Sequence, residues 1–180
     1  DNIPEVHIVD RYLETVKHLG IINDNQGLDF FLSASDKIDV SIFSKDYIVF
    51  VIGGQHTTKI LPNEKIISII KKVNKPVLLV GGPKDFERGE GVVLNTKNTV
   101  NTCGKYSILQ SASLVQQAKM VITHDTGMMH IAAAFKKKIY SVWGNTVPEF
   151  GMYPYKEYEN SKIIEVKGLS CRPCSKIGYD

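Results

Sequence analysis

Cysteine is scarce in this sequence, and it has neither long apolar runs nor a strong excess of one charge. Three cysteines among 180 residues are too few, and odd in number, for a disulfide framework, which predicts a reducing, cytoplasmic compartment. No apolar run approaches the roughly 18 residues that a membrane-spanning helix needs. The net charge of +3 is too small to indicate a nucleic-acid-binding protein.

The N-terminal stretch offers no targeting signal. Residues 1–12, DNIPEVHIVDRY, lack both the basic and the apolar region of a secretory signal peptide. Because the sequence begins with Asp1 instead of Met, we expect either a processed N-terminus or a piece of a longer chain. The length suits one domain with a substantial core, with room for an appendage.

Two of the three cysteines, Cys171 and Cys174, form a C-x-x-C pair in the last ten residues, 171–180. A single pair supplies only half of a tetrahedral zinc site, and the βαβ context of a redox dithiol is missing. We therefore expect 171–180 to be a separate tail and expect no metal site in the rest of the chain. Two interpretations stay open: a structural or incidental role, or a metal site or disulfide with partners beyond residue 180.

From residue 47 onward, apolar runs alternate with amphipathic segments. Strands are expected within residues 47–54, 75–83, 99–107, 120–125, 137–145 and 162–166. Helices are expected over 63–73, 108–119 and 127–135, the first two with Asn63 and Ser107 as N-caps. This alternation predicts an α/β, Rossmann-like domain over 47–170, with a parallel sheet and helices on both of its faces.

Residues 1–46 do not follow this alternation. Residues 6–21 predict an amphipathic helix, with Tyr12, Leu13 and Val16 on its apolar side and Gly20 at its C-terminal end. Residues 28–46 have a mixed pattern that predicts one strand and a polar connection. We interpret 1–46 as a bridge from something upstream.

Polar or glycine-rich loops follow the expected strands at 53–59, 81–89, 104–107, 124–130 and 144–149. Parallel strands bring these loops to one edge of the sheet, where open α/β sheets bind ligands. Glycines and a helix N-terminus favour a phosphate-bearing ligand, with Thr126 and Gly127 in the first turn and His130 one turn further. Lys59 would neutralise phosphate charge from the facing loop.

Each of these residues also has an ordinary structural interpretation. Asp125 alone is a candidate helix N-cap. His130 is a candidate for a buried, satisfied histidine, and Met128 and Met129 for core filling. The glycine pairs do not form G-x-G-x-x-G, so the fingerprint of nicotinamide-dependent dehydrogenases is absent.

Taken together, the motifs resemble one family. Residues 124–149, HDTGMMHIAAAFKKKIYSVWGNTVPE, are similar to the signature D-[ST]-G-x-x-H-x-A-A-A…(F/W)-G-x-T-x-P of glycosyltransferase family 9, the ADP-heptose:lipopolysaccharide heptosyltransferases. Residues 9–21, VDRYLETVKHLGI, resemble the family's interdomain helix, and the loops GGQHTTKILP and VGGPKD resemble its first two loops. The resemblance spans about residues 6–155 and implies the C-terminal, donor-binding half of a GT-B fold.

The resemblance also implies which residues bind the donor. Those residues are Thr57, Thr58, Lys59, Asp85, Asp125, Thr126, Gly127, Met128 and His130. Motif residues 126–128 and 130 would surround the diphosphate and sugar, and Asp125 would accept hydrogen bonds from sugar hydroxyls. Lys59, with one of the two threonines, would hold phosphate oxygens, and Asp85 would lie near the ribose. Leu61 stands where the family has Trp, so the identity of the sugar stays open.

In such enzymes the general base and the acceptor site belong to the N-terminal domain. The resemblance therefore implies no catalytic residue here, and we expect the isolated chain to be inactive. It implies an inverting transfer without an obligatory cofactor, from an ADP-heptose-like donor to lipopolysaccharide core or another surface glycan. It also implies a place at the inner face of the cytoplasmic membrane. Three alternatives stay open: a stand-alone nucleotide- or phosphate-binding module, a GT-B epimerase, and a half-domain whose site has decayed.

Overall fold

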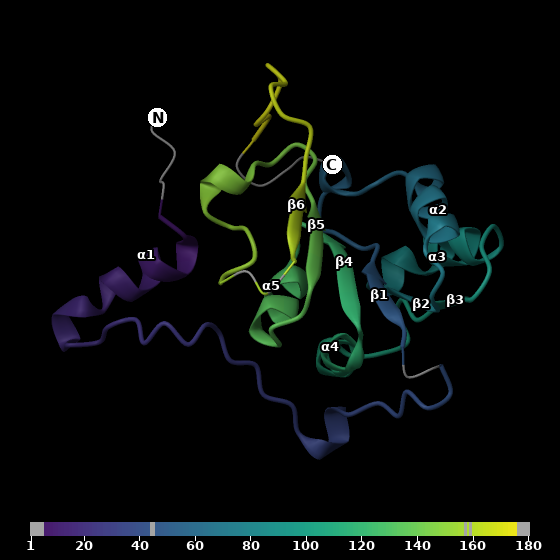
Figure 1. Cartoon of the computed structure of the whole chain (residues 1–180), viewed down its shortest axis with the longest axis horizontal. Coiled ribbons are helices and arrows are strands. Elements are labelled where there is room, and N and C mark those ends of the chain that lie inside the picture. Colours follow the sequence, from purple (N-terminus) through teal and green to yellow (C-terminus); the bar gives the residue numbers. More distant parts are fainter. Residues whose placement is uncertain (1–5, 44–45, 157, 159, 176–180) are drawn as a thin grey trace.

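A computed structural model describes residues 6–43, 46–156, 158 and 160–175 of the protein. A six-stranded sheet forms its centre, with the order β3-β2-β1-β4-β5-β6 and every neighbouring pair parallel (Figure 1). The strands are β1 (Ile48–Val51), β2 (Val77–Val80), β3 (Thr99–Asn101), β4 (Met120–His124), β5 (Ile139–Val142) and β6 (Lys162–Ile164). All six strands expected from the apolar runs are therefore confirmed, as is their parallel arrangement.

Helices cover both faces of the sheet, as predicted. They are α2 (Asn63–Lys72), α3 (Phe86–Val93), α4 (Ile108–Gln117) and α5 (Gly127–Ala134), preceded by α1 (Ile8–Thr15) outside the sheet. Ile66 of α2 and Val92 of α3 belong to the buried cluster on one face. Leu114 of α4 and Met129 of α5 belong to the cluster on the other. Covered on both sides, β1 and β2 are buried along their whole length.

The helix starts test the two predicted N-caps. Ser107 is confirmed as the N-cap of α4, where its hydroxyl accepts the N–H of Gln110 at 3.2 Å. The prediction for Asn63 is wrong, because Pro62 occupies the N-cap and Asn63 is the first residue of α2. The Asn63 side-chain oxygen instead accepts a hydrogen bond from Arg88 of α3 at 2.7 Å.

Two further stretches differ from the sequence-based expectation. The second half of the loop expected over 81–89 is the start of α3, and Gly89 lets this helix lie directly against the buried side chain of Asn101. The strand expected in 28–46 is absent from residues 28–43, which contain one short 3₁₀ turn, Ala34–Asp36. This stretch runs along α4 instead of the sheet, since Ile38 N–H donates to Ser113 Oγ at 3.0 Å and Ile38 C=O accepts from Gln117.

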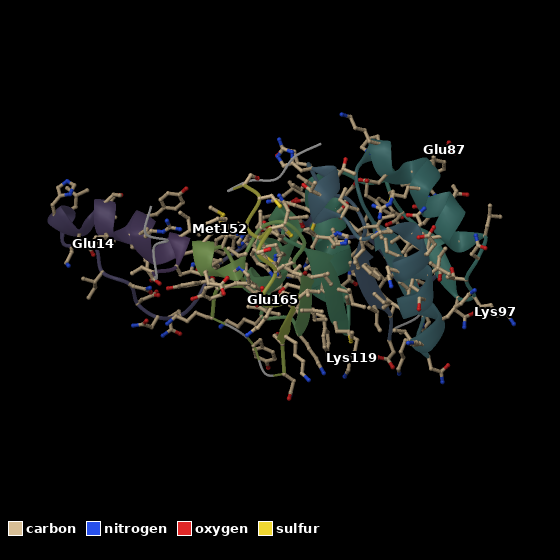
Figure 2. All side chains as sticks on the ribbon, turned by 90° about the horizontal axis from the view of Figure 1, so that it is seen from above. Glu14, Glu87, Lys97, Lys119, Met152 and Glu165 are labelled. Carbon is tan, nitrogen blue, oxygen red and sulfur yellow. The ribbon has the colours of Figure 1, made fainter. Side chains whose placement is uncertain are left out.

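The predicted N-terminal helix is present, shorter than expected. It ends at Thr15 and continues as a 3₁₀ turn, Lys17–Leu19, which stops at Gly20 with a positive φ of 78°. Its start is tied to the segment after β5, since His7 Nε2 lies 2.7 Å from the carbonyl oxygen of Tyr153. Figure 2 shows Glu14 of α1 at the opposite end of the molecule from Lys97, which precedes β3. Within the described chain no residue of α1 is buried, and its apolar Tyr12 is 68% exposed.

A membrane span is not found in the part of the chain that the structure describes, where every helix is too short or too polar to cross a bilayer.

The central strands should dominate stability. We predict that Leu79→Ala, at a fully buried position in β2, lowers the free energy of unfolding by about 2–5 kcal/mol, because it leaves a cavity between the sheet and its helices. This corresponds to a Tm about 4–20 °C lower. Leu94→Ala is the matched control, since Leu94 is 85% exposed and its loss should change stability by less than about 0.5 kcal/mol. Thermal unfolding followed by circular dichroism measures both, and equal effects would contradict the described packing.

Candidate functional site

Two adjoining cavities open at the carboxyl edge of the sheet. The larger, here the glycine-lined cavity, measures about 550 Å³ and is lined by the glycine pairs 53–54 and 81–82 together with Asp85, Tyr106, Thr126 and Met128, among others. The smaller, here the charged cavity, measures about 320 Å³ and is lined by Gln55, His56, Lys59, Asp125, Thr126, Gly127 and His130. Thr126 lines both, so the two cavities adjoin at this residue.

An ion pair forms the wall of the charged cavity. Lys59 Nζ lies 2.6 Å from Asp125 Oδ2, and the side chains of the two residues are only 14% and 8% exposed. The hydroxyl of Thr146, which follows β5, donates to the same carboxylate oxygen at 2.9 Å. Asp125 is therefore held between two loops, and the interpretation of Asp125 as an N-cap is wrong, since Thr126 occupies that position of α5.

The N-terminus of α5 opens into the same cavity. A Cβ atom built on Gly127, the first residue of the helix, would meet nothing within 4 Å. The first turn of a helix presents backbone N–H groups without partners inside the helix and carries partial positive charge. Such an end, beside a lysine, suits an anion.

His130 lies one turn further along α5 and lines the charged cavity. Burial is the main cause that lowers its pKa below the usual 6.5, and His7 and Lys59 lower it further, while Asp125 acts in the opposite direction. The imidazole of His130 is therefore neutral at pH 7, and one ring nitrogen donates while the other accepts. A group of this kind suits hydroxyl recognition better than charge neutralisation.

The structure brings together most of the residues that the sequence singled out. Lys59, Asp125, Thr126, Gly127 and His130 line the charged cavity. Asp85, Thr126 and Met128 line the glycine-lined cavity, so Met128 shares a cavity with Thr126 but not with Asp125, Gly127 and His130. The carboxylate of Asp85 also closes its own turn, since it accepts the N–H of Gly82 at 2.8 Å.

The two threonines next to Lys59 are placed differently. Thr57 and Thr58 lie in the 3₁₀ turn Thr57–Lys59, are exposed, and line neither of the two cavities. Sequence analysis missed Gln55, Tyr106 and Thr146. Their loops were expected at this edge, but no spacing or pattern distinguishes these side chains from their neighbours in the loops.

His124, the last residue of β4, is fully buried and lies directly before Asp125. Its Nε2 accepts the N–H of Leu61 at 3.0 Å, so the ring proton lies on Nδ1. Burial, reinforced by the nearby Arg88 cation, lowers the pKa of His124 to about 4. The neutral ring thus links β4 to the loop that carries Lys59.

The tail 171–180 is described only as far as residue 175. Arg172 donates to the carbonyl oxygen of Thr146 at 2.7 Å and forms an ion pair with Glu165 at 3.2 Å. Cys171 and Cys174 are exposed thiols, and within the described residues no group of three or more His, Cys, Asp or Glu side chains could hold a metal. The tail therefore supports the loop behind Asp125, which favours the structural interpretation, while a metal site or disulfide stays an open prediction.

A family model described as glycosyltransferase family 9 (heptosyltransferase) matches residues 3–179. The chain belongs to this family. It is 33% identical over 79 residues to lipopolysaccharide heptosyltransferase 2 of Escherichia coli K12, a match that covers 41% of this chain and 23% of that relative. The corresponding protein of Salmonella typhimurium LT2 is 32% identical over a segment of the same length.

Solved structures of this family share the fold. The family 9 glycosyltransferase from Veillonella parvula superposes with a TM-score of 0.81 at 22% identity, covering 93% of this chain and 52% of that one. E. coli heptosyltransferase WaaC, solved with ADP, gives a TM-score of 0.69 at 22% identity, covering 93% of this chain and 53% of that one. The chain therefore spans about half the length of these proteins and has the Rossmann-like architecture of one half of a GT-B fold.

The buried histidines should make stability depend on pH. Because the unfolded chain protonates His124 near pH 6.5 but the folded chain only near about pH 4, stability should fall as the pH falls between these values. At pH 4.5, the titration of His124 should lower the free energy of unfolding by about 2–3 kcal/mol relative to neutral pH. The pKa values of His7 and His130 are lowered too and act in the same direction.

Urea unfolding at pH 7.5 and pH 4.5 measures this loss, and the His124→Gln variant assigns it. Without the buried imidazole, the variant should lose distinctly less stability than the wild type between the two pH values. An unchanged difference would show that His124 does not titrate as its surroundings imply.

Proposed function

We propose that this chain is the donor-binding domain of an inverting glycosyltransferase that uses a nucleotide sugar. The observation that carries the proposal is the Lys59–Asp125 pair at the open N-terminus of α5, beside the glycine-lined cavity. Along this edge of the sheet lie, in spatial order, the weakly polar glycine-lined cavity, the positive charge of Lys59 and the α5 N-terminus, and the polar charged cavity. A nucleoside, a diphosphate and a sugar need these three environments in the same order.

In this proposal the nucleoside occupies the glycine-lined cavity. The glycine pairs leave room for it, and the Tyr106 ring and Met128 offer apolar contacts. Asp85, in the same cavity, is the candidate for hydrogen bonding to ribose hydroxyls. The diphosphate passes over Thr126 to the first turn of α5, where Gly127 adds no side chain that would obstruct it.

The sugar occupies the charged cavity. Asp125 uses its carboxylate, and His130 its neutral imidazole, to bind sugar hydroxyls. Lys59, which is paired with Asp125, also shares its charge with a phosphate oxygen. As the bond to the sugar breaks, negative charge grows on the departing diphosphate, where Lys59 and the helix N-terminus stabilise it. Thr57 or Thr58 contributes only if the turn that holds them moves toward the ligand.

The donor class follows from the relatives. The E. coli neighbour was solved with ADP and with ADP-2-deoxy-2-fluoro heptose, so we propose an ADP-heptose-like donor and a lipopolysaccharide core acceptor. The general base and the acceptor site would belong to the half of those relatives that this chain does not match. We therefore expect this chain to bind donor without transferring sugar, and the whole protein to act at the cytoplasmic face of the membrane.

The alternative is a nucleotide- or phosphate-binding module without transferase activity. It uses the same two cavities and differs only in what the rest of the protein supplies. An assay for transfer of heptose to lipopolysaccharide core by the full-length protein separates the two, because a binding module would bind the donor and form no product.

Nucleotide binding by this chain is the first test. At about 100 times its dissociation constant, ADP should stabilise the fold by about 2.7 kcal/mol, which corresponds to a Tm about 5–11 °C higher. UDP, GDP and CMP should give smaller shifts. Lys59→Ala should weaken ADP binding at least about tenfold, or about 1.4 kcal/mol, because it removes the phosphate-facing charge. Lys65→Ala, on the exposed side of α2, is the control and should leave binding unchanged.

The Asp125→Ala variant distinguishes binding of the sugar from binding of the nucleotide. It should weaken binding of ADP-heptose more than binding of ADP, because the carboxylate is assigned to sugar hydroxyls. If no nucleotide raises the Tm of either this chain or the full-length protein, the proposed function is wrong.

A further inference from the structure

Lys59 belongs to a segment with little structure of its own. Between β1 and α2, the chain forms only the single 3₁₀ turn Thr57–Lys59, whose hydrogen bonds join Lys59 N–H to His56 C=O and Ile60 N–H to Thr57 C=O. One isolated 3₁₀ turn is a weak structure. The position of the lysine ammonium group therefore depends on what holds the ends of this turn from outside.

Leu61, two residues after Lys59, is held at both polar groups of its backbone. Its N–H donates to Nε2 of the buried His124 at 3.0 Å. Its carbonyl oxygen accepts a hydrogen bond from the guanidinium of Arg88. The two partners come from different elements, the end of β4 and the first turn of α3.

Arg88 spans the whole segment. Besides Leu61, its guanidinium donates to the carbonyl oxygen of Ile52 at 2.6 Å, where β1 has just ended, and to the side chain of Asn63 at 2.7 Å, where α2 begins. One rigid planar group thus fixes the distance between the start and the end of the loop. Each of the three acceptors meets a different nitrogen of the guanidinium, and a lysine, whose donors all lie on one nitrogen, does not match that spacing.

His124 couples the loop to the other half of the ion pair. It is adjacent in the chain to Asp125, so the same strand end presents the carboxylate and, through the ring, anchors the segment that delivers Lys59. Gly144, after β5, supports the turn from another side. A Cβ atom there would lie 2.5 Å from the carbonyl oxygen of Thr58, so this close approach needs glycine.

We propose that Arg88 and His124 are positioning residues for the donor phosphate: together they hold the Leu61 peptide groups and thereby keep Lys59 in the wall of the charged cavity. The proposal rests on the proposed function, and it assigns roles to two residues that line neither cavity. Lys59 is then preorganised before the ligand arrives, so binding does not have to order the loop.

The test uses two substitutions of one residue. His124→Leu replaces the imidazole with an apolar side chain of similar size and removes the acceptor for Leu61 N–H. His124→Gln replaces the ring nitrogen with an amide oxygen at about the reach of Nε2, so an acceptor is retained. We expect His124→Leu to raise the dissociation constant for ADP at least about tenfold, and His124→Gln to return it to within about threefold of wild type. Arg88→Lys should also raise the dissociation constant for ADP. This variant keeps the positive charge but loses the hydrogen bonds that join Ile52, Leu61 and Asn63.

Two further measurements separate positioning from general stability. Amide hydrogen exchange at Leu61 should accelerate in His124→Leu and recover in His124→Gln. Tyr47→Phe is the matched control, because it removes a buried hydrogen bond, from Tyr47 Oη to Leu114 C=O at 2.7 Å, at the opposite end of β1. It should lower Tm and leave the dissociation constant for ADP unchanged.

The outcomes are distinct. If wild type binds no ADP, the proposed function fails, and the role of the clamp in ligand binding fails with it. If wild type binds ADP and His124→Leu binds it equally well, the clamp alone is wrong. If Tyr47→Phe weakens binding as much as His124→Leu does, affinity follows overall stability and the positioning role is also wrong.

Discussion

The reversal of winding direction between β1 and β4 determines where the site lies. From β1 the chain builds outward through β2 and β3, and from β4 it builds in the other direction through β5 and β6. The loops that leave β1 and β4 therefore turn to opposite faces and leave a crevice between them, the usual ligand position in open parallel sheets. Lys59 follows β1 and Asp125 follows β4, so their ion pair closes across this crevice.

The site residues do not act as isolated side chains. Asp125 is shared by Lys59 and Thr146, and the carbonyl group of Thr146 is in turn held by Arg172 from the tail. On the other side, Arg88 and His124 hold the loop that carries Lys59. A charged pair with so little exposure needs such support, because a buried carboxylate or ammonium group without partners is costly.

The centre of the sheet could be predicted from the sequence because β1 and β2 are continuous apolar runs, which marks burial on both faces, whereas the edge strands β3 and β6 are shorter and partly exposed. The sequence pattern did not predict α3, because Gly89 and Gly91 interrupt its helical periodicity. The glycine at position 89 is explained by the close packing of the helix against Asn101. The polar motif 125–130 pointed to this candidate site, since polar residues at the junction of two apolar segments conflict with burial. Tertiary placement decided the rest: Met128 faces the larger cavity, and Thr57 and Thr58 face solvent.

His124 shows the limit of local pattern most clearly. In the sequence it is a polar residue beside the motif, and nothing in the spacing tells whether it faces ligand, solvent or core. Its role depends on Leu61, 63 residues earlier in the chain, and on Arg88 between them. The usable signal is the conflict itself: a fully buried imidazole at the end of a strand is unfavourable without hydrogen-bond partners, and here Nε2 is the nitrogen for which the described residues supply one. Once the partner of Nε2 is known to be a backbone N–H two residues from Lys59, the buried histidine and the motif 125–130 belong to one hydrogen-bonded arrangement.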